Sequence, residues 1–294
     1  MMEAHVCDVC GEDDAADIDA TRHYTGGQAA SVCRNCGFVY ARLRPSSEEV
    51  TKAWAEEIFA AGTFTEATYT ARGIPAVRAR HVYVAEFVAT RIGTQGRDLV
   101  DIGAGEGEFL TLLQEPRYET KVFGIEPSGP NCELMTKAGV ACFHGRIEEY
   151  LAAPGRKPGG FDLATIAWTL ENTGSCSGMM EGARSLLKTG GYLTVATSSR
   201  ILVPFKKPMH YFLHPRALAI HPFFFSANAL TNLFTRAGFE VEHINRFIDT
   251  DYLVMSGRAL AEPAKKPLLK DDWRAVISFF DRWHAETRDY YAST

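Results

Sequence analysis

The chain has 294 residues, of which 46% are hydrophobic and 23% charged, and its formal net charge is -5. This composition is typical of a globular protein with one large or two unequal domains, and it argues against a broad basic face for nucleic acid. No apolar run approaches the ~20 residues that cross a bilayer, and the N-terminus lacks a signal-peptide pattern, so we expect a cytoplasmic protein.

Two cysteine pairs lie near the N-terminus, Cys7 with Cys10 and Cys33 with Cys36. Each pair has the C-x2-C spacing and is followed by glycine. In a cytoplasmic protein such cysteines indicate metal ligands or free thiols more than disulfides. Four thiolates suit tetrahedral Zn²⁺ in a closed, structural site. We therefore predict a four-cysteine zinc ribbon over residues 1–45.

Other features of this leader leave alternatives open. Two independent reduced pairs, or a redox motif, would give the same spacing. Three further polar residues lie near the cysteines, and we expect them to be solvated because four sulfurs already complete the ligand shell: His5, Asp8 and His23. The stretch between the pairs is polar and offers little core without a metal.

Two helices are predicted after the leader. Apolar residues at helical spacing after a cap-like Ser46 or Ser47 predict the first, which extends to Gly62 and lies in a linker over 46–75. The second is predicted from about Pro75 to Ile92 and opens the main domain, 76–262.

The stretch "DLVDIGAGEGEFL" places three glycines at alternate positions directly after a short apolar run. Residues 98–102 predict a buried strand with Asp101 near its end, and residues 106–115 predict a helix. The glycines, Gly103, Gly105 and Gly107, therefore lie on a strand-to-helix turn, where ligands meet parallel sheets. Without Cβ atoms, this turn can contact a flat or bulky group through its backbone.

Further strands and helices alternate along the rest of the domain. Residues 121–128 predict a second strand that ends in Glu126, an acid placed to accept both hydroxyls of a ribose. The remaining strands are predicted within 139–151, 161–172, 179–197, 226–244 and 251–259. This order predicts an α/β fold with a seven-stranded, mostly parallel sheet and helices on both faces.

These motifs together resemble class I S-adenosylmethionine-dependent methyltransferases over roughly Ala76 to Ala259. The first motif of that family is similar to "VDIGAGEGEFL", its acidic ribose motif to "FGIEPS", and its late helix-turn-strand to "LLKTGGYLTVAT". The resemblance implies a Rossmann-like methyltransferase fold and S-adenosyl-L-methionine as cofactor. The cofactor residues that it implies are Asp101, Gly103, Ala104, Gly105, Gly107, Glu126, Pro127, Arg146, Ile147 and Trp168, with Tyr69 and Arg72 as further candidates for the cofactor's carboxylate.

The predicted zinc leader makes the resemblance more specific, because sugar C-methyltransferases also begin with two cysteine pairs. Their ribose motif often contains Glu-Pro-Ser, as at Glu126–Ser128, and their His-Glu-His segment aligns with "LAIHPFFFS". Only the second histidine, His221, is present here, because Ala219 and Ile220 occupy the other two positions. Their large C-terminal domain is also missing after Ala261. The pattern therefore indicates a shortened relative with a different acceptor, and an O-methyltransferase is one alternative.

Residues 204–226 form the predicted acceptor lid, between the fifth strand and the next helix. This segment combines aromatic and cationic residues with side chains that can remove a proton from the molecule to be methylated. Its candidate catalytic residues are His221 as the preferred base, then His210 or His214, then Tyr211.

A final helix is predicted within 263–294. Its apolar stripe (Trp273, Ile277, Phe280 and Trp283) indicates core or a homodimer face. The favoured function is methyl transfer to a small-molecule acceptor of the sugar or sugar-nucleotide type. Two alternatives remain open. One is an RNA base methyltransferase whose zinc ribbon binds RNA, and the other is a non-catalytic zinc-ribbon binding module.

Overall fold

The protein was analysed as a computed structural model, which describes residues 2–52, 75–154, 159–204 and 207–288. The main α/β sheet has seven strands in the order β12-β13-β10-β9-β6-β7-β8. The strands from β10 to β8 are mutually parallel, and β13 runs antiparallel to both β10 and β12. The predicted α/β fold with a mostly parallel sheet is therefore confirmed.

The bounds of the main-domain elements match the predicted alternation. The strands are β6 (Asp98–Ile102), β7 (Lys121–Glu126), β8 (Ala141–His144), β9 (Phe161–Ala167), β10 (Leu187–Thr197), β12 (Phe239–Ile244) and β13 (Leu253–Ala259). The helices are α3 (Pro75–Arg91), α4 (Glu108–Leu113), α5 (Gly129–Lys137), α6 (Ile147–Ala152), α7 (Cys176–Leu186) and α9 (Ala227–Arg236), with the 3-10 turn η3 (Leu170–Asn172).

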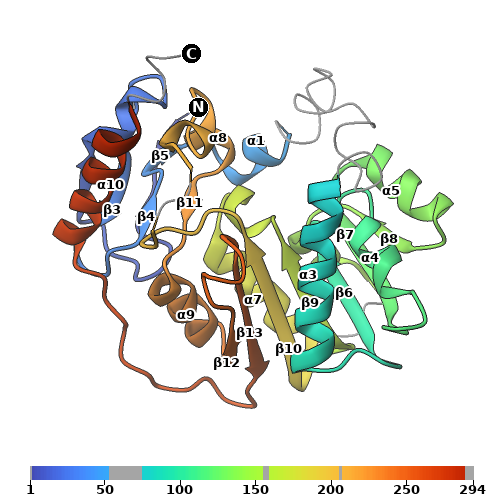
Figure 1. The fold of residues 1–294 in the computed structure, drawn as a ribbon. Coiled ribbons are helices and arrows are strands. Elements are labelled where there is room, and N and C mark those ends of the chain that lie inside the picture. Colours follow the sequence, from blue (N-terminus) through green and yellow to red (C-terminus); the bar gives the residue numbers. More distant parts are fainter. Residues whose placement is uncertain (1, 53–74, 155–158, 205–206, 289–294) are drawn as a thin grey trace.

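Helices cover both faces of this sheet, so its central strands are apolar on both sides (Figure 1). Leu99 and Val100 are neighbours in β6, and both are fully buried. Leu99 belongs to the buried cluster that includes residues of α3, α4 and α5, whereas Val100 belongs to the cluster that includes residues of α6, α7 and α9. Continuous apolar runs of this kind are characteristic of parallel strands that are buried on both faces.

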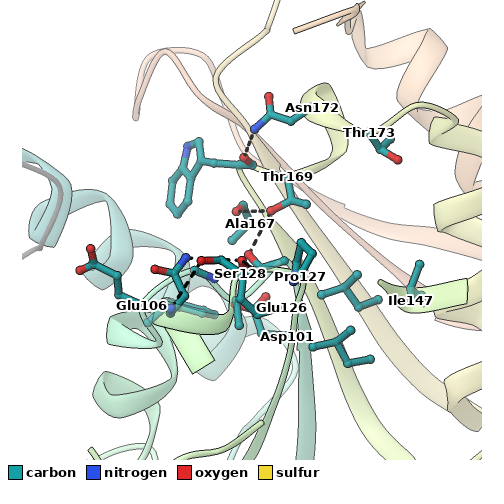
Figure 2. Close-up of a pocket in the computed structure, with 18 of the residues that line it drawn as sticks. Asp101, Glu106, Glu126, Pro127, Ser128, Ile147, Ala167, Thr169, Asn172 and Thr173 are labelled. Carbon is teal, nitrogen blue, oxygen red and sulfur yellow. Dashed lines mark hydrogen bonds between the residues drawn. The ribbon is translucent and has the colours of Figure 1, made fainter. Parts of the chain in front are cut away.

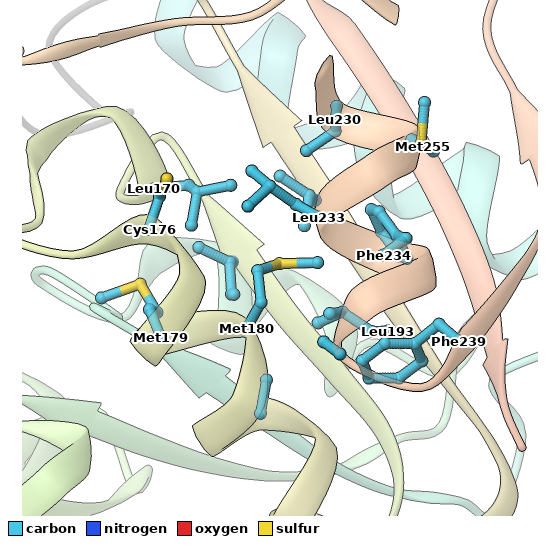
Figure 3. Close-up of a cluster of buried hydrophobic side chains, with 14 of the residues drawn as sticks. Leu170, Cys176, Met179, Met180, Leu193, Leu230, Leu233, Phe234, Phe239 and Met255 are labelled. Carbon is cyan, nitrogen blue, oxygen red and sulfur yellow. The ribbon is translucent and has the colours of Figure 1, made fainter. Parts of the chain in front are cut away.

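The core between α7, α9 and the sheet is built mainly from leucine, methionine and phenylalanine side chains (Figure 3). Met180 of α7 faces Leu233 and Phe234 of α9 across Leu193 of β10. The Ser175 and Ser226 hydroxyls accept backbone N–H groups at the first turns of α7 and α9. These N-caps begin each helix at the register that points its apolar face to the sheet.

The N-terminal leader forms a second, smaller sheet with a distant segment. Its elements are β1 (Glu3–Ala4), β2 (Ala15–Ile18), η1 (Asp19–His23), β3 (Ala30–Cys33), β4 (Val39–Tyr40), β5 (Leu43–Arg44) and α1 (Ser47–Lys52). The sheet order is β11-β4-β3-β2, and β11 (Phe223–Phe224) comes from the predicted acceptor lid. That lid also holds η4 (Met209–Tyr211) and α8 (Ala217–Ile220). The leader and the lid are therefore paired strand to strand.

The last helix, α10 (Trp273–Thr287), covers this smaller sheet. It buries Val276, Phe280 and Trp283 with residues of β3, β4 and the lid, while Trp273 and Ile277 are only half-buried. The apolar stripe thus serves as core within this chain, and a homodimer stays a prediction. Within the described residues, no helix combines the length and apolar character needed to cross a membrane.

Candidate functional site

A cavity of about 260 Å³ opens at the carboxyl ends of β6, β7 and β9 (Figure 2). Nine of the predicted cofactor residues line it: Asp101, Gly103, Ala104, Gly105, Glu126, Pro127, Arg146, Ile147 and Trp168. Gly107 does not line this cavity. Tyr69 and Arg72 lie outside the described residues. A parallel sheet brings these positions together because its successive strands end at one edge.

Glycine is required for a different structural reason at each of the three positions of the turn. All have positive φ angles, 74° at Gly103, 56° at Gly105 and 79° at Gly107. A Cβ atom at Gly103 would lie 2.3 Å from Thr169 Cγ2, and one at Gly107 would lie 2.2 Å from Met135 Cγ. A Cβ atom at Gly105 would meet nothing within 4 Å. Only Gly105 therefore has open space where the predicted cofactor contact lies, and Gly107 makes room for α5.

Glu126 ends β7 as a buried carboxylate whose two oxygens both accept backbone N–H groups. Gly105 N–H donates to Oε2 at 2.9 Å, and Ser128 N–H donates to Oε1 at 3.0 Å. Asn131 Nδ2 donates to the same Oε1 at 3.4 Å. Burial raises the pKa of Glu126, while these hydrogen bonds oppose the shift. A buried acid held in this way can accept further hydrogen bonds from a diol.

Asp101 lies deeper in the cavity, and its side chain accepts a hydrogen bond of 2.7 Å from Thr165 Oγ1. Burial raises the pKa of Asp101 to about 7, because desolvation disfavours its charged form. A cation placed beside this carboxyl would favour the ionised form and lower that pKa again.

One wall of the cavity carries an aromatic and cationic group that sequence patterns did not reveal. His81 of α3 lies with its ring 5.4 Å from that of Trp168, and the Arg80 guanidinium lies 4.3 Å from the Trp168 ring centroid. Trp168 has a φ of 55°, a strained conformation for a bulky residue. Its carbonyl accepts Asn172 Nδ2 at 2.9 Å. The sequence of α3 gave no signal for His81, because a single histidine in a helix forms no spacing pattern with other candidate residues.

The predicted catalytic residues lie elsewhere, since none of His210, Tyr211, His214 and His221 lines the cavity. His221 comes nearest, because its Nδ1 forms a hydrogen bond with Asn172 Oδ1, and Asn172 does line the cavity. Burial lowers the pKa of His221 to about 4. Tyr211 is 69% exposed. The lid segment therefore faces the leader more than the cavity, because its strand β11 pairs with β4.

The four leader cysteines converge on one point. Their sulfur atoms all lie within 4.8 Å of one another, with Cys7 and Cys36 Sγ 3.6 Å apart and Cys10 and Cys33 Sγ 3.5 Å apart. Sulfurs about 2.3 Å from a tetrahedral Zn²⁺ would have similar separations, so the donor set fits this ion. Thiol hydrogen bonds from Cys36 and Cys7 lower the pKa of Cys33, whereas the pKa values of Cys7 and Cys36 are raised by their hydrogen bonds with Cys33 and by burial. The metal remains a proposal.

One residue near this cluster corrects the expectation from sequence. Asp8, expected to be solvated, has a side chain only 6% exposed and pairs with Arg44 at 2.8 Å. Its position between Cys7 and Cys10 gave no sign of burial, because its partner Arg44 comes from the other end of the leader. His5 is half-buried, and His23 is exposed as expected.

Comparisons with known proteins identify the family of the main domain. A family model described as a methyltransferase domain matches residues 76–244, more than half of the chain. No curated protein matches the sequence. The Burkholderia thailandensis 1,6-didemethyltoxoflavin-N1-methyltransferase, solved with 1,6-didemethyltoxoflavin and S-adenosylhomocysteine, is similar at 16% identity and a TM-score of 0.54 over 84% of this chain and 99% of that chain.

A second solved structure is similar to this chain in fold. The Streptomyces coelicolor A3(2) geranyl diphosphate C-methyltransferase, solved with Mg²⁺, geranyl diphosphate and S-adenosylhomocysteine, has 13% identity and a TM-score of 0.53 over 74% of this chain and 98% of that chain. At these identities the likeness concerns the fold. With the family match, the chain belongs to the methyltransferase-domain family and is an S-adenosylmethionine-dependent methyltransferase.

Proposed function

We propose that the cavity binds S-adenosylmethionine and that the chain methylates a polar small molecule of the sugar or sugar-nucleotide type. The observation that carries this proposal is the pairing of buried Glu126 with open Gly105 in one cavity. Glu126 would accept the ribose hydroxyls, and Ile147 would border the adenine. Asp101 would hold the amino group of the methionyl part. The bound cofactor supplies an activated methyl group on a sulfonium.

The acceptor is proposed to enter beside Trp168. Arg80 lies over the Trp168 ring, and the Tyr252 ring packs edge-on against it at 5.9 Å. Arg200, half-buried, donates from Nη1 to the Tyr252 carbonyl at 3.1 Å, and burial lowers its pKa. The Arg80 guanidinium beside the Trp168 ring, within the cavity, suits a planar or phosphorylated acceptor, while Arg200 supports Tyr252 from outside the cavity. These residues orient the acceptor and exclude water from it.

Two imidazoles are proposed as candidates to accept the proton of the acceptor. His81 lines the cavity, and burial and the neighbouring Arg80 charge lower its pKa to about 3. His221 lies behind Asn172 with its pKa lowered to about 4. Both rings are therefore neutral at physiological pH but weak bases, so either would accept the proton only as methyl transfer makes that proton strongly acidic. His81 has the better position because it reaches the cavity without an intermediary.

The function is tested by binding and by transfer. We expect S-adenosylhomocysteine to bind the purified protein with a 1:1 stoichiometry in a calorimetric titration. With methyl-labelled S-adenosylmethionine and a cell extract, we expect label in the small-molecule fraction. Absence of binding would overturn the assignment of the cavity. Label confined to RNA would instead support the alternative of an RNA base methyltransferase.

The affinity for S-adenosylhomocysteine is expected to depend on pH through Asp101. Its pKa of about 7 in the free protein means that half of the carboxyls are protonated at that pH. Because the ligand's ammonium group favours the ionised form, the affinity should be constant above pH 8 and fall roughly tenfold per pH unit below 7. Calorimetry from pH 5.5 to 8.5 measures this slope. The Asp101→Asn variant should bind more weakly at pH 8 and lose most of the slope; an unchanged slope would place the titrating group elsewhere.

A further inference from the structure

A buried ion pair joins the cysteine cluster to the wall of the cavity. Asp8 lies in the turn between Cys7 and Cys10, and its Oδ2 is 2.8 Å from Arg44 Nη2. The side chains of Asp8 and Arg44 are only 6% and 2% exposed. We call these two residues the anchor pair. Because both charges are withdrawn from water, each is stable there only while the other stays in place.

The anchor pair also binds Gly174 and Ser175, which directly follow the cavity-lining residues Asn172 and Thr173. Arg44 donates to the Gly174 carbonyl from Nε at 3.3 Å and from Nη2 at 3.1 Å. Ser175 Oγ donates to Asp8 Oδ1 at 3.1 Å. Gly174 and Ser175 directly follow Thr173, which lines the cavity together with Asn172 (Figure 2). Asp8 and Arg44, next to the cysteine cluster, therefore fix the position of the segment that carries Asn172 and Thr173.

The remaining contacts of the anchor pair leave it little freedom to move. Arg44 Nη1 donates to the Ala41 carbonyl at 3.0 Å, and its guanidinium lies 4.8 Å from the Phe223 ring centroid. The Ser175 hydroxyl also accepts Gly178 N–H at 3.1 Å as the N-cap of α7. A shift of the Cys7–Cys10 turn would therefore move Asp8 and strain the wall. A metal ion on the four sulfurs would hold that turn in its present place.

We propose that Asp8 and Arg44 are positioning residues that couple metal binding at the cysteine cluster to cofactor binding in the cavity. The inference rests on the proposed function of the cavity. Coupling of this kind is reciprocal, so each ligand must raise the affinity of the other by the same factor. The four-cysteine cluster would then be an integral support of the cofactor site.

The reciprocal effect gives a readout that does not depend on methyl transfer. Zinc-loaded wild-type protein is titrated with a chromophoric zinc chelator, with and without saturating S-adenosylhomocysteine. We expect the ligand to raise the apparent zinc affinity at least fivefold, the lower end of typical coupling of about 5–150-fold. Equal zinc affinities in the two titrations would overturn the inference.

Variants locate the coupling in the anchor pair. Asp8→Asn leaves a buried guanidinium unpaired, so the Asp8→Asn/Arg44→Met double variant, which removes both charges, protects the test against misfolding. In the zinc-loaded double variant we expect at least fivefold weaker S-adenosylhomocysteine binding and no effect of that ligand on zinc affinity. The matched control is Asp13→Asn, which breaks an exposed leader pair with Arg42 and should behave as wild type.

The outcomes separate the two proposals. Wild-type protein that binds no S-adenosylhomocysteine overturns the proposed function of the cavity and this inference with it. Wild-type protein that binds the ligand, together with a double variant of unchanged affinity and unchanged coupling, overturns this inference alone.

Discussion

Replacing Glu126 with alanine is expected to raise the dissociation constant for S-adenosylhomocysteine about 100-fold. Two ribose hydroxyls would lose a charged acceptor, and hydrogen bonds to charged groups contribute about 1.5–3 kcal/mol each. Water that enters the site of the lost carboxylate would replace part of this, and a net loss of about 2.7 kcal/mol, the value of one such bond, corresponds to a factor of 100. The variant also releases Gly105 N–H, which donates to Glu126 at 2.9 Å, so the open turn loses a support. Calorimetry at pH 8 measures the change.

Two further variants show whether this loss is specific. Glu126→Gln keeps the shape of the side chain and one oxygen acceptor, so we expect an intermediate loss. Glu133→Ala removes an exposed acid from α5, the helix that follows the ribose motif, and should leave the affinity unchanged. Thermal unfolding of each variant checks that the fold is retained. Equal affinities for Glu126→Ala and wild type would mean that this carboxylate does not contact the ligand.

The fold could be predicted from sequence because its signals are local. A buried run, a glycine turn and an amphipathic helix follow one another within residues 98–115, and strands continue to alternate with helices along the domain. The same local signals placed Gly105 and Glu126 at the carboxyl edge of the sheet. Both positions lie at strand ends, and here the glycine turn and the Glu-Pro-Ser motif mark those ends in the sequence.

The acceptor side could not be predicted because its contacts are long-range. The pairing of β11 with β4 joins Phe223 and Phe224 to residues nearly two hundred positions earlier, and it turns the lid toward the leader. Nothing in the spacing of His210, His214 and His221 reports that pairing. Conversely, His81 reaches the cavity only because α3 packs beside Trp168. Functional groups that depend on such packing require the three-dimensional structure.

Removing one sulfur from the cysteine cluster is expected to have the largest effect on stability. Cys7, Cys33 and Cys36 are buried in the leader, whose strands are short and depend on the turns that carry these residues. Structural zinc sites contribute about 10–16 kcal/mol of apparent binding free energy to folding. We therefore expect Cys33→Ala to lose the metal and more than about 5 kcal/mol of stability. Metal content by atomic absorption and denaturant unfolding under reducing conditions measure both effects.

The matched control is Cys176→Ala, because Cys176 is equally buried but lies in α7 outside the cluster. It removes one sulfur from a packed core and should cost only about 1–2 kcal/mol, with one zinc ion per chain retained. The loss in Cys33→Ala should spread beyond the leader, because β11 and α10 both pack on the same small sheet. Protection of amide hydrogens in α10 would then fall together with that in β3. Wild-type protein that contains no zinc, or a Cys33→Ala variant as stable as wild type, would show that the four thiols hold the leader without a metal.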